Sequence, residues 1–356
     1  MPLSVGIVGL PNVGKSTLFE AITKKQVNKA NYPFCTIEPN IGVVAVSDDR
    51  LDKLATLFQI TTKIYPLIEF IDIAGLVAGS YKGEGLGNKF LAHIRETDAI
   101  VYVLRVFQDE KIINSQNGII DVLVEKGILD KELILKDLET IEKKFQELEI
   151  KIKNRQKEIL KEFEIIKKIK NLLEKQKLLI EENLNLEEKK IVNSYQLLTL
   201  KPRIYLLNGR NEEITPLILE KFKENNWSFL IMDVKTELEN LEFSEQEKKE
   251  LGLSLDNKLD NLIKKSYEIL DLITFFTTNM KEIRGWTLKK GTRVFQASGI
   301  IHTDFEKNFI QAEVISWKDL INAGGFNEAR QKGLIRIEGK EYFVQDGDLI
   351  EIKHGS

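Results

Sequence analysis

The sequence has 356 residues, of which 30% are charged and 42% hydrophobic, a composition typical of a soluble globular protein with two or three domains. The formal net charge is −3, so no overall basic excess indicates nucleic-acid binding, although a local basic patch remains compatible with it. The single cysteine, Cys35, excludes a disulfide framework and favours a reducing compartment.

No apolar run reaches the roughly 18 residues that a membrane-spanning helix requires. Residues 1–4 lead directly into the apolar run 5–8, and no basic leader precedes an apolar signal core. We therefore expect a cytoplasmic protein that does not enter a membrane.

The first part of the chain, to about residue 125, alternates between strand-like and helix-like segments. Residues 99–106 are apolar on both faces, as strands of a buried parallel sheet tend to be. The alternation predicts a parallel sheet covered by helices. The expected strands are residues 5–8, 41–46, 67–71 and 99–106, and the expected helix is 16–24.

The middle of the chain, from about residue 130 to 193, is rich in Lys, Glu, Leu and Ile and contains neither Pro nor Gly. Its apolar residues recur at spacings of three and four, which is a heptad-like seam. Two antiparallel helices would bury each other's seam, so we predict a coiled-coil hairpin with its turn near Asn154 over one long helix. The seam residues are Ile134, Leu138, Ile141, Phe145, Leu148 and Ile152, then Ile159, Phe163, Ile166, Ile169 and Leu173.

After the hairpin the α/β pattern resumes, which indicates that the hairpin is inserted into the first domain. The expected elements are a strand at 203–207, a helix at about 212–225, a strand at 228–232 and a helix at about 244–271. From residue 272, short strands and glycine-rich turns predict a small α+β module. Asp346-Gly347 lies between the apolar runs 342–344 and 349–352 and predicts a turn.

Residues 9–16 match the phosphate-binding pattern G-x-x-x-x-G-K-[ST], between a predicted strand and a predicted helix. Backbone N–H groups of such a loop surround phosphates, and the positive end of the helix adds to the attraction. We expect Lys15 to reach the β- and γ-phosphates and Ser16 to ligate Mg²⁺. With a strand and a helix on either side, a chance glycine turn is disfavoured. The predicted nucleotide contacts in this loop are Asn12, Val13, Gly14, Lys15, Ser16 and Thr17.

A second motif, Asp72-Ile73-Ala74-Gly75, ends the predicted strand 67–71. An acid there can hold Mg²⁺ through water, and the Gly75 N–H can sense the γ-phosphate, so Gly75 joins Lys15 as a candidate catalytic group. Thr36, in the intervening loop, is the candidate switch threonine that completes the Mg²⁺ shell, the alternative being an ordinary loop threonine. Leu76 stands where many regulatory GTPases carry a water-orienting Gln, which predicts slow hydrolysis without a partner.

Together these motifs resemble the YchF family, the bacterial Obg-like ATPases of the translation-factor class of P-loop proteins. The resemblance covers nearly the whole chain. It rests on residues 9–17, 31–40, 72–77, 83–91, 94–99 and 198–202 leading into Asn208, and on 281–286, 301–312 and 345–348, which resemble a TGS module.

The resemblance implies an OBG-type G domain at residues 1–127 and 196–271, an inserted helical coiled-coil hairpin at 128–195 and an α+β TGS domain at 272–354. It also implies a preference for ATP over GTP and binding to the ribosome. The family usually has a histidine where this chain has Asn114, which cannot act as a general base but can orient water. His302 is expected to be structural or partner-facing.

Base recognition departs from the family. Ordinary GTPases read guanine with N-K-x-D and the family has N-x-x-E, whereas this chain has Asn208-Gly209-Arg210-Asn211. The Asn211 amide can donate as well as accept, so it is compatible with adenine and poor for guanine. The alternative is that Asn211 caps the helix that follows. Asn12 suggests a K⁺ site beside the phosphates, or only shapes the loop.

Three functions remain open: an ATPase switch on the ribosome, a GTPase that assists ribosome assembly, and a non-enzymatic adaptor that nucleotide stabilises. Glu interleaves with the hairpin lysines, which indicates a solvated coiled-coil face, whereas the resemblance favours a binding role for them. We expect a monomer. The lone cysteine and scattered histidines lack ligand spacing, so Mg²⁺ is the one metal with a predicted site besides candidate K⁺.

Overall fold

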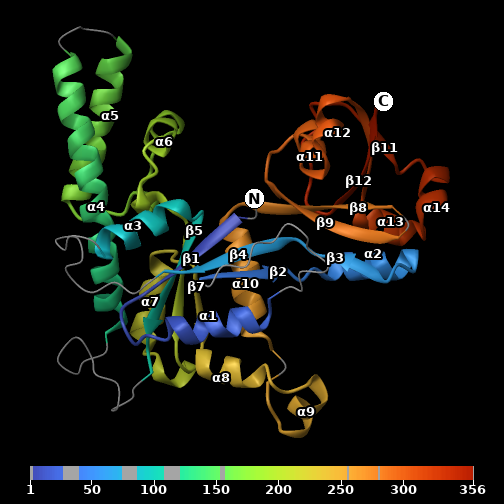
Figure 1. Cartoon of the computed structure of the whole chain (residues 1–356), viewed down its shortest axis with the longest axis horizontal. Coiled ribbons are helices and arrows are strands. Elements are labelled where there is room, and N and C mark those ends of the chain that lie inside the picture. The colour runs from blue at the N-terminus through green and yellow to red at the C-terminus, as the bar shows by residue number, and fades with distance from the viewer. Residues whose placement is uncertain are drawn as a thin grey trace.

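Two six-stranded sheets and a projecting pair of helices make up the protein in a computed structural model (Figure 1). The structure describes residues 3–26, 40–73, 86–107, 121–152, 157–254, 256–279 and 281–355, and within 86–90 the backbone alone. Among these residues, no helix is long and apolar enough to cross a membrane.

The first sheet has the strand order β2-β4-β1-β5-β6-β7. Every residue of β5 and β6 is buried, since helices cover both faces of the sheet. The predicted parallel sheet is confirmed with one exception: the edge strand β2 pairs with β4 in antiparallel fashion. The strands are β1 (Leu3–Val8), β2 (Ile41–Ala45), β4 (Leu67–Asp72), β5 (Ala99–Arg105), β6 (Arg203–Asn208) and β7 (Phe229–Met232).

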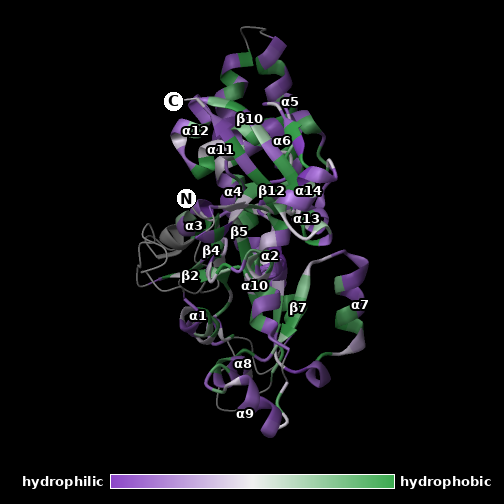
Figure 2. Ribbon diagram, turned by 90° about the vertical axis from the view of Figure 1, so that its right-hand side faces the viewer, coloured by the Kyte–Doolittle hydropathy of each residue, from purple (hydrophilic) through white to green (hydrophobic). Residues whose placement is uncertain are grey.

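The helices beside this sheet are α1 (Lys15–Lys24), α3 (Leu86–Glu96), α7 (Pro216–Glu224), α8 (Val234–Asn240), α9 (Glu245–Glu250) and α10 (Lys258–Ile269). The single helix predicted at about 244–271 is wrong. Gly252 adopts a left-handed conformation with φ +66° that ends α9, and the side chain of Asn257 caps a new helix, α10. Figure 2 shows hydrophobic residues along β5 and β7 and hydrophilic residues over α9.

The predicted hairpin is confirmed. Helix α4 (Val122–Lys151) and helix α5 (Lys157–Glu174) pack side by side and project from the first sheet (Figure 1). Ile141 and Leu148 of α4 share one hydrophobic cluster with Ile166 and Ile169 of α5. The predicted turn near Asn154 lies outside the described residues. The chain returns to the sheet through η4 (Leu179–Glu181), α6 (Leu186–Asn193) and η5 (Leu198–Leu200).

The second sheet has the order β11-β10-β12-β8-β9-β3 and contains one strand from the first part of the chain. That strand, β3 (Thr62–Ile64), runs parallel to β9. The preceding helix, α2 (Asp49–Phe58), places Leu51 and Leu54 in a cluster with Phe276. The other strands are β8 (Leu272–Thr278), β9 (Glu282–Lys289), β10 (Phe309–Ser316), β11 (Arg336–Glu338) and β12 (Asp348–His354), and the helices are α11 (Val294–Ile301), α12 (Thr303–Lys307), α13 (Trp317–Ala323) and α14 (Phe326–Gln331).

The sequence did not predict this sharing of a sheet. The turn predicted at Asp346-Gly347 is confirmed, with Gly347 at φ +88°, but residues 342–344 form no strand beside β12. The domain limits 1–127, 128–195, 196–271 and 272–354 stay a prediction. Helix α4 crosses residue 128 without a break, and its Leu129 and Leu133 belong to the core of the first sheet.

Candidate nucleotide-binding site

The phosphate loop connects the carboxyl end of β1 to α1, as predicted. Two residues have left-handed backbones, Asn12 at φ +63° and Gly14 at φ +100°. A Cβ atom on Gly14 would lie 2.3 Å from Nδ2 of Asn208. Glycine is therefore required here both for its backbone conformation and for the close approach of Asn208.

Lys15 lies inside the curl of this loop and is 9% exposed. Its Nζ donates hydrogen bonds to the carbonyl oxygens of Gly9 at 2.8 Å and Leu10 at 2.7 Å. Burial lowers the pKa of Lys15 to about 8, while the carboxylates of Asp72 and Glu125 act in the opposite direction. Phosphate oxygens at this position would favour the charged ammonium.

Ser16 and Thr17 occupy the first turn of α1, where backbone N–H groups have no intrahelical partner and attract anions. Ser16 is exposed and Thr17 half-buried. Their contacts with nucleotide and Mg²⁺ stay predictions.

Asp72 ends β4, next to β1, and Ile7 of β1 is its partner in the strand register. Burial raises the pKa of Asp72, and the charge of Lys15 partly offsets this. The hydroxyl of Ser16 and the carboxylate of Asp72 are hard oxygen donors, which suit Mg²⁺ that keeps several waters. Among the described residues, no group of three His, Cys, Asp or Glu side chains could hold a metal ion.

Asn208 ends β6 and is 4% exposed. Its Nδ2 donates to the carbonyl oxygen of Val13 at 2.8 Å, and its Oδ1 accepts from the N–H of Val234 at 3.0 Å. Both ends of the amide are thus used to join the phosphate loop to the start of α8. Asn208 supports the loop, and because its Nδ2 carries a second N–H, the predicted contact of Asn208 with a base stays a prediction.

Asn211 is exposed and begins the short turn η6 (Asn211–Glu213). The helix that follows, α7, begins after Thr215 with Pro216 in its first turn. The alternative that Asn211 caps this helix is therefore wrong. Its exposed amide stays a candidate for base recognition.

Sequence reasoning missed one carboxylate of this site, Glu125 in the first turn of α4. Its Oε2 accepts a hydrogen bond of 2.9 Å from the N–H of Arg105 at the end of β5. Burial raises the pKa of Glu125 to about 7, against the effects of Arg105 and Lys15. The one sequence signal was an acid near the start of a helix, which is a general preference and identifies no site.

Thr36, Gly75, Leu76 and Asn114 lie outside the described residues, so their predicted roles stay predictions. His302 lies far along the chain in the second sheet's module, where its Nδ1 accepts from the N–H of Asp304 at 3.2 Å and caps α12. This is a structural role, one of the two expected for it.

Comparison with known proteins identifies the family. A model described as "50S ribosome-binding GTPase" matches residues 4–209, and YchF-GTPase_C, described as "Protein of unknown function (DUF933)", matches residues 272–355. The "Ribosome-binding ATPase YchF" of Bacillus subtilis (strain 168) is 44% identical, over 99% of each chain. The chain belongs to the YchF family.

Other members of the family agree with this assignment. The protein of the same name from Haemophilus influenzae is also 44% identical over 99% of each chain. The solved structure of the Schizosaccharomyces pombe YchF GTPase has a TM-score of 0.88 and 38% identity, covering 99% of this chain and 97% of that one. The predicted fold class is confirmed: a P-loop G domain with a helical insertion and a C-terminal mixed β domain.

Proposed function

We propose that this chain is a Mg²⁺-dependent ATPase that prefers ATP to GTP and acts as a nucleotide switch on the ribosome. One observation carries the proposal: the loop at residues 9–16 holds Lys15 within hydrogen-bond distance of its own carbonyls, beside Asp72 and the free N–H groups of α1. The relatives from two bacteria carry the name "Ribosome-binding ATPase YchF". Ribosomes lie in the cytoplasm, which is the location we propose.

Each residue of the site has its own role in binding and hydrolysis. The N–H groups of residues 12–17 surround the phosphates, and Lys15 neutralises charge on the β- and γ-phosphates. Ser16 and Asp72, with Thr36, would hold Mg²⁺, which would neutralise charge on the transferred phosphoryl group. Gly75 would contact the γ-phosphate. Leu76 offers no hydrogen bond to water, so we expect slow turnover until a partner or Asn114 orients the attacking water.

For base recognition, Asn208 fixes the loop and keeps a second N–H for the base, and Asn211 would face the base with its exposed amide. The amide of Asn211 is compatible with adenine and poor for guanine, because guanine's N1–H and 2-amino group are best matched by a carboxylate. We propose that the ion beside the phosphates is K⁺ and that Asn12 is one of its ligands. Asn12 is exposed, and its backbone has φ +63°. Hydrolysis that is unchanged when Na⁺ replaces K⁺ would contradict the K⁺ site.

The deciding experiment is a titration of the purified protein with fluorescent ATP and GTP analogues and Mg²⁺, each competed with the unlabelled nucleotide. A preference for ATP of ten-fold or more, about 1.4 kcal/mol, would support the proposal. Equal affinity, or preference for GTP, would support the second candidate, a ribosome-assembly GTPase. The word GTPase appears in the matched family description and in the name of the fission yeast structure, which is the reason to keep this candidate. Tight binding without turnover, even with ribosomes, would indicate the adaptor.

A further inference from the structure

A basic cavity of about 380 Å³ lies where α3 meets the hairpin, away from the nucleotide site. Its lining includes four cations, Arg95, Lys136, Lys143 and Lys144, and two carboxylates, Glu139 and Glu147. Thr140 and Tyr195 complete the wall. The cations outnumber the carboxylates here, although the whole chain has a net charge of −3.

Arg95 is the most informative residue of this cavity. Its NH2 group donates weakly to Oγ1 of Thr140 at 3.3 Å, and its buried Nε has no hydrogen-bond partner among the described residues. A buried donor without a partner costs free energy, so it favours a ligand that supplies acceptor oxygens. Arginine is suited to phosphate oxygens because of its planar, forked donors.

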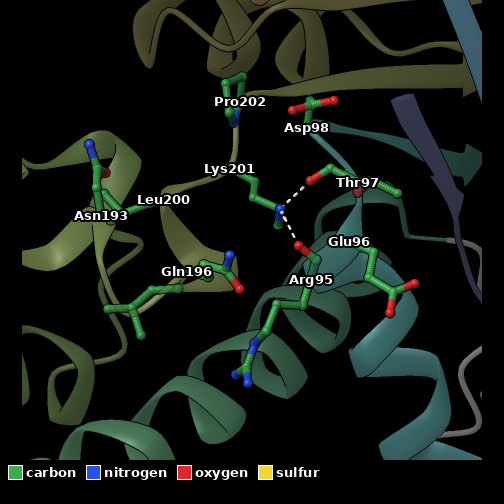
Figure 3. A pocket seen from close by; sticks show the side chains of 10 residues that line it. Arg95, Glu96, Thr97, Asp98, Asn193, Gln196, Leu200, Lys201 and Pro202 are labelled. Carbon is green, nitrogen blue, oxygen red and sulfur yellow. Dashed lines mark hydrogen bonds between the residues drawn. The ribbon is translucent and has the colours of Figure 1, made fainter. Parts of the chain in front are cut away.

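In the neighbouring cavity, by contrast, the lysine ammonium has hydrogen-bond acceptors. It has a volume of about 390 Å³ and shares Arg95, but its lining includes the acids Glu96 and Asp98 (Figure 3). Lys201 donates there to the backbone oxygens of Arg95 and Thr97 at the end of α3. The guanidinium of Arg95 points away from Lys201 in this view. Lys201 is thus structural, whereas the Nε of Arg95 faces no hydrogen-bond partner among the described residues.

The lysines of the basic cavity form a row. Lys136, Thr140, Lys143 and Lys144 lie on one face of α4, because their spacings are three, four, seven and eight residues. At 1.5 Å per residue the row from Lys136 to Lys144 is roughly 12 Å long, which suits several phosphates of one strand and is too long for one small anion.

Only part of this positive charge is paired. Lys136 pairs with Glu139 at 2.8 Å, and Lys144 lies 3.5 Å from Glu147 and 3.7 Å from Glu162. Lys143 is exposed and forms no salt bridge with any residue that the structure describes. Since such helix-surface pairs are worth little, phosphates can replace the glutamates as partners.

We propose that this cavity binds the phosphate backbone of RNA, an inference that rests on the proposed ribosome binding and names the surface that performs it. Arg95 provides the forked contact at the base of the cavity, and the row on α4 follows the backbone outward. The ammonium of Lys144 lies over the ring of Tyr195, 5.8 Å from its centroid.

The test compares two charge-matched variants. Lys143→Gln with Lys144→Gln removes two charges from the cavity. Lys167→Gln with Lys189→Gln removes two exposed charges elsewhere on α5 and α6 and serves as the control. Binding to ribosomes is measured at several salt concentrations, with basal ATPase activity as the check on folding.

The expected result for the cavity variant is at least ten-fold weaker binding to ribosomes and a salt dependence, log K against log salt, that is shallower by about 2. The control should stay within two-fold of the wild type. If the wild type binds ribosomes and the cavity variant binds with equal affinity and slope, the inference is overturned.

Two competitors then identify the ligand. A short RNA helix should displace the protein from ribosomes, and polyglutamate at equal charge should not; displacement by polyglutamate alone would overturn the inference in favour of an acidic protein. If the wild type binds no ribosomes, the proposed function fails, and direct titration with the RNA helix tests the inference separately. RNA binding that the cavity variant loses would support the inference. Absence of RNA binding by the wild type would overturn the inference.

Discussion

At the scale of single residues, the nucleotide site depends on a few close approaches that tolerate no added atoms or charges. The phosphate loop passes so near Asn208 that Gly14 has no room for a side chain. The loop's own carbonyls hold the Lys15 ammonium, and a partly buried carboxylate, Glu125, acts on it from α4. Each contact can be tested with one substitution.

Gly14→Ala is expected to weaken ATP binding at least ten-fold. The new Cβ would displace the Asn208 amide from the Val13 carbonyl and would sit in a left-handed backbone that alanine disfavours. Gly127→Ala is the control, because no atom lies within 4 Å of its Cβ position on α4. It should leave binding unchanged and raise the free energy of unfolding by about 0.5–1 kcal/mol. Unchanged ATP affinity in Gly14→Ala would contradict the geometry.

Glu125 makes stability depend on pH. Its pKa is raised from 4.5 to about 7 on folding, so the folded state holds the proton more tightly than the unfolded chain. Stability from this group is therefore present below about pH 4.5 and is lost as the pH rises through about 7. Glu125→Gln keeps an acceptor for the Arg105 N–H and has no charge, so it should raise the free energy of unfolding at pH 8 by about 1–3 kcal/mol.

Urea unfolding of wild type and Glu125→Gln at pH 5 and pH 8 measures this. The difference between the two proteins should be small at pH 5 and larger at pH 8. Glu149→Gln, an exposed position on the same helix, should change little at either pH. Loss of stability in Glu125→Gln at pH 8 would mean that the charge itself, through Arg105 or Lys15, holds the site together.

At the scale of elements, α4 is the most consequential helix, because it begins beside the nucleotide site and ends at the far end of the hairpin. Its first turns pack in the core of the first sheet, and its later turns form the coiled coil. Between these parts, the fully buried Asp137 accepts from the N–H groups of Leu198 at 2.9 Å and Thr199 at 2.8 Å and from the Thr199 hydroxyl at 2.6 Å. The hydrogen bonds of this carboxylate connect α4 to η5.

Asp137→Ala is expected to lower the free energy of unfolding by about 3 kcal/mol or more, because two N–H groups and a hydroxyl lose their acceptor in a buried place. Thr199→Val, which removes the hydroxyl alone, should cost about 1–2 kcal/mol. Urea unfolding followed by circular dichroism gives both values. An Asp137→Ala variant as stable as the wild type would show that η5 finds other partners.

At the scale of the whole molecule, the two sheets are connected by packed elements and not by a linker alone. Strand β3 belongs to the first part of the chain and to the second sheet. Arg50 of α2 donates to Asp48 at 2.7 Å and to Asp346 at 2.7 Å, and Asp346 also accepts from the N–H of Thr274. The guanidinium lies 5.5 Å from the ring of Phe276. We infer that the second sheet moves with the first.

Arg50→Ala should therefore lower the free energy of unfolding by about 1–3 kcal/mol, since it removes the ion pair between α2 and the turn before β12, while the apolar contacts of α2 with Phe276 keep the molecule in one calorimetric transition. Arg293→Ala is the matched control: its pair with Glu341 is exposed and lies within the second part, so the expected cost is within about 1 kcal/mol. Two transitions already present in the wild type would contradict a joined molecule.

The sequence by itself determined the features that depend on residues close together in the chain. The phosphate loop, the acid at the end of β4 and the seam of the hairpin could be predicted, because a loop pattern or a repeat of three and four residues reports local geometry directly. The turn at Asp346-Gly347 was predicted for the same reason. The break between α9 and α10 was missed, because a single glycine is tolerated in many helices and the cap at Asn257 gives a weak signal.

Only the tertiary structure decided what depends on distant partners. Asn208 supports the loop through Val13, 195 residues away, and Arg50 reaches Asp346 across 296 residues. The placement of Glu125 beside Lys15, of β3 in the second sheet, and of Arg95 beside the lysines of α4 also follows from packing. Such contacts form when whole elements bury their apolar faces against one another, and no local pattern encodes which polar side chains that burial brings together.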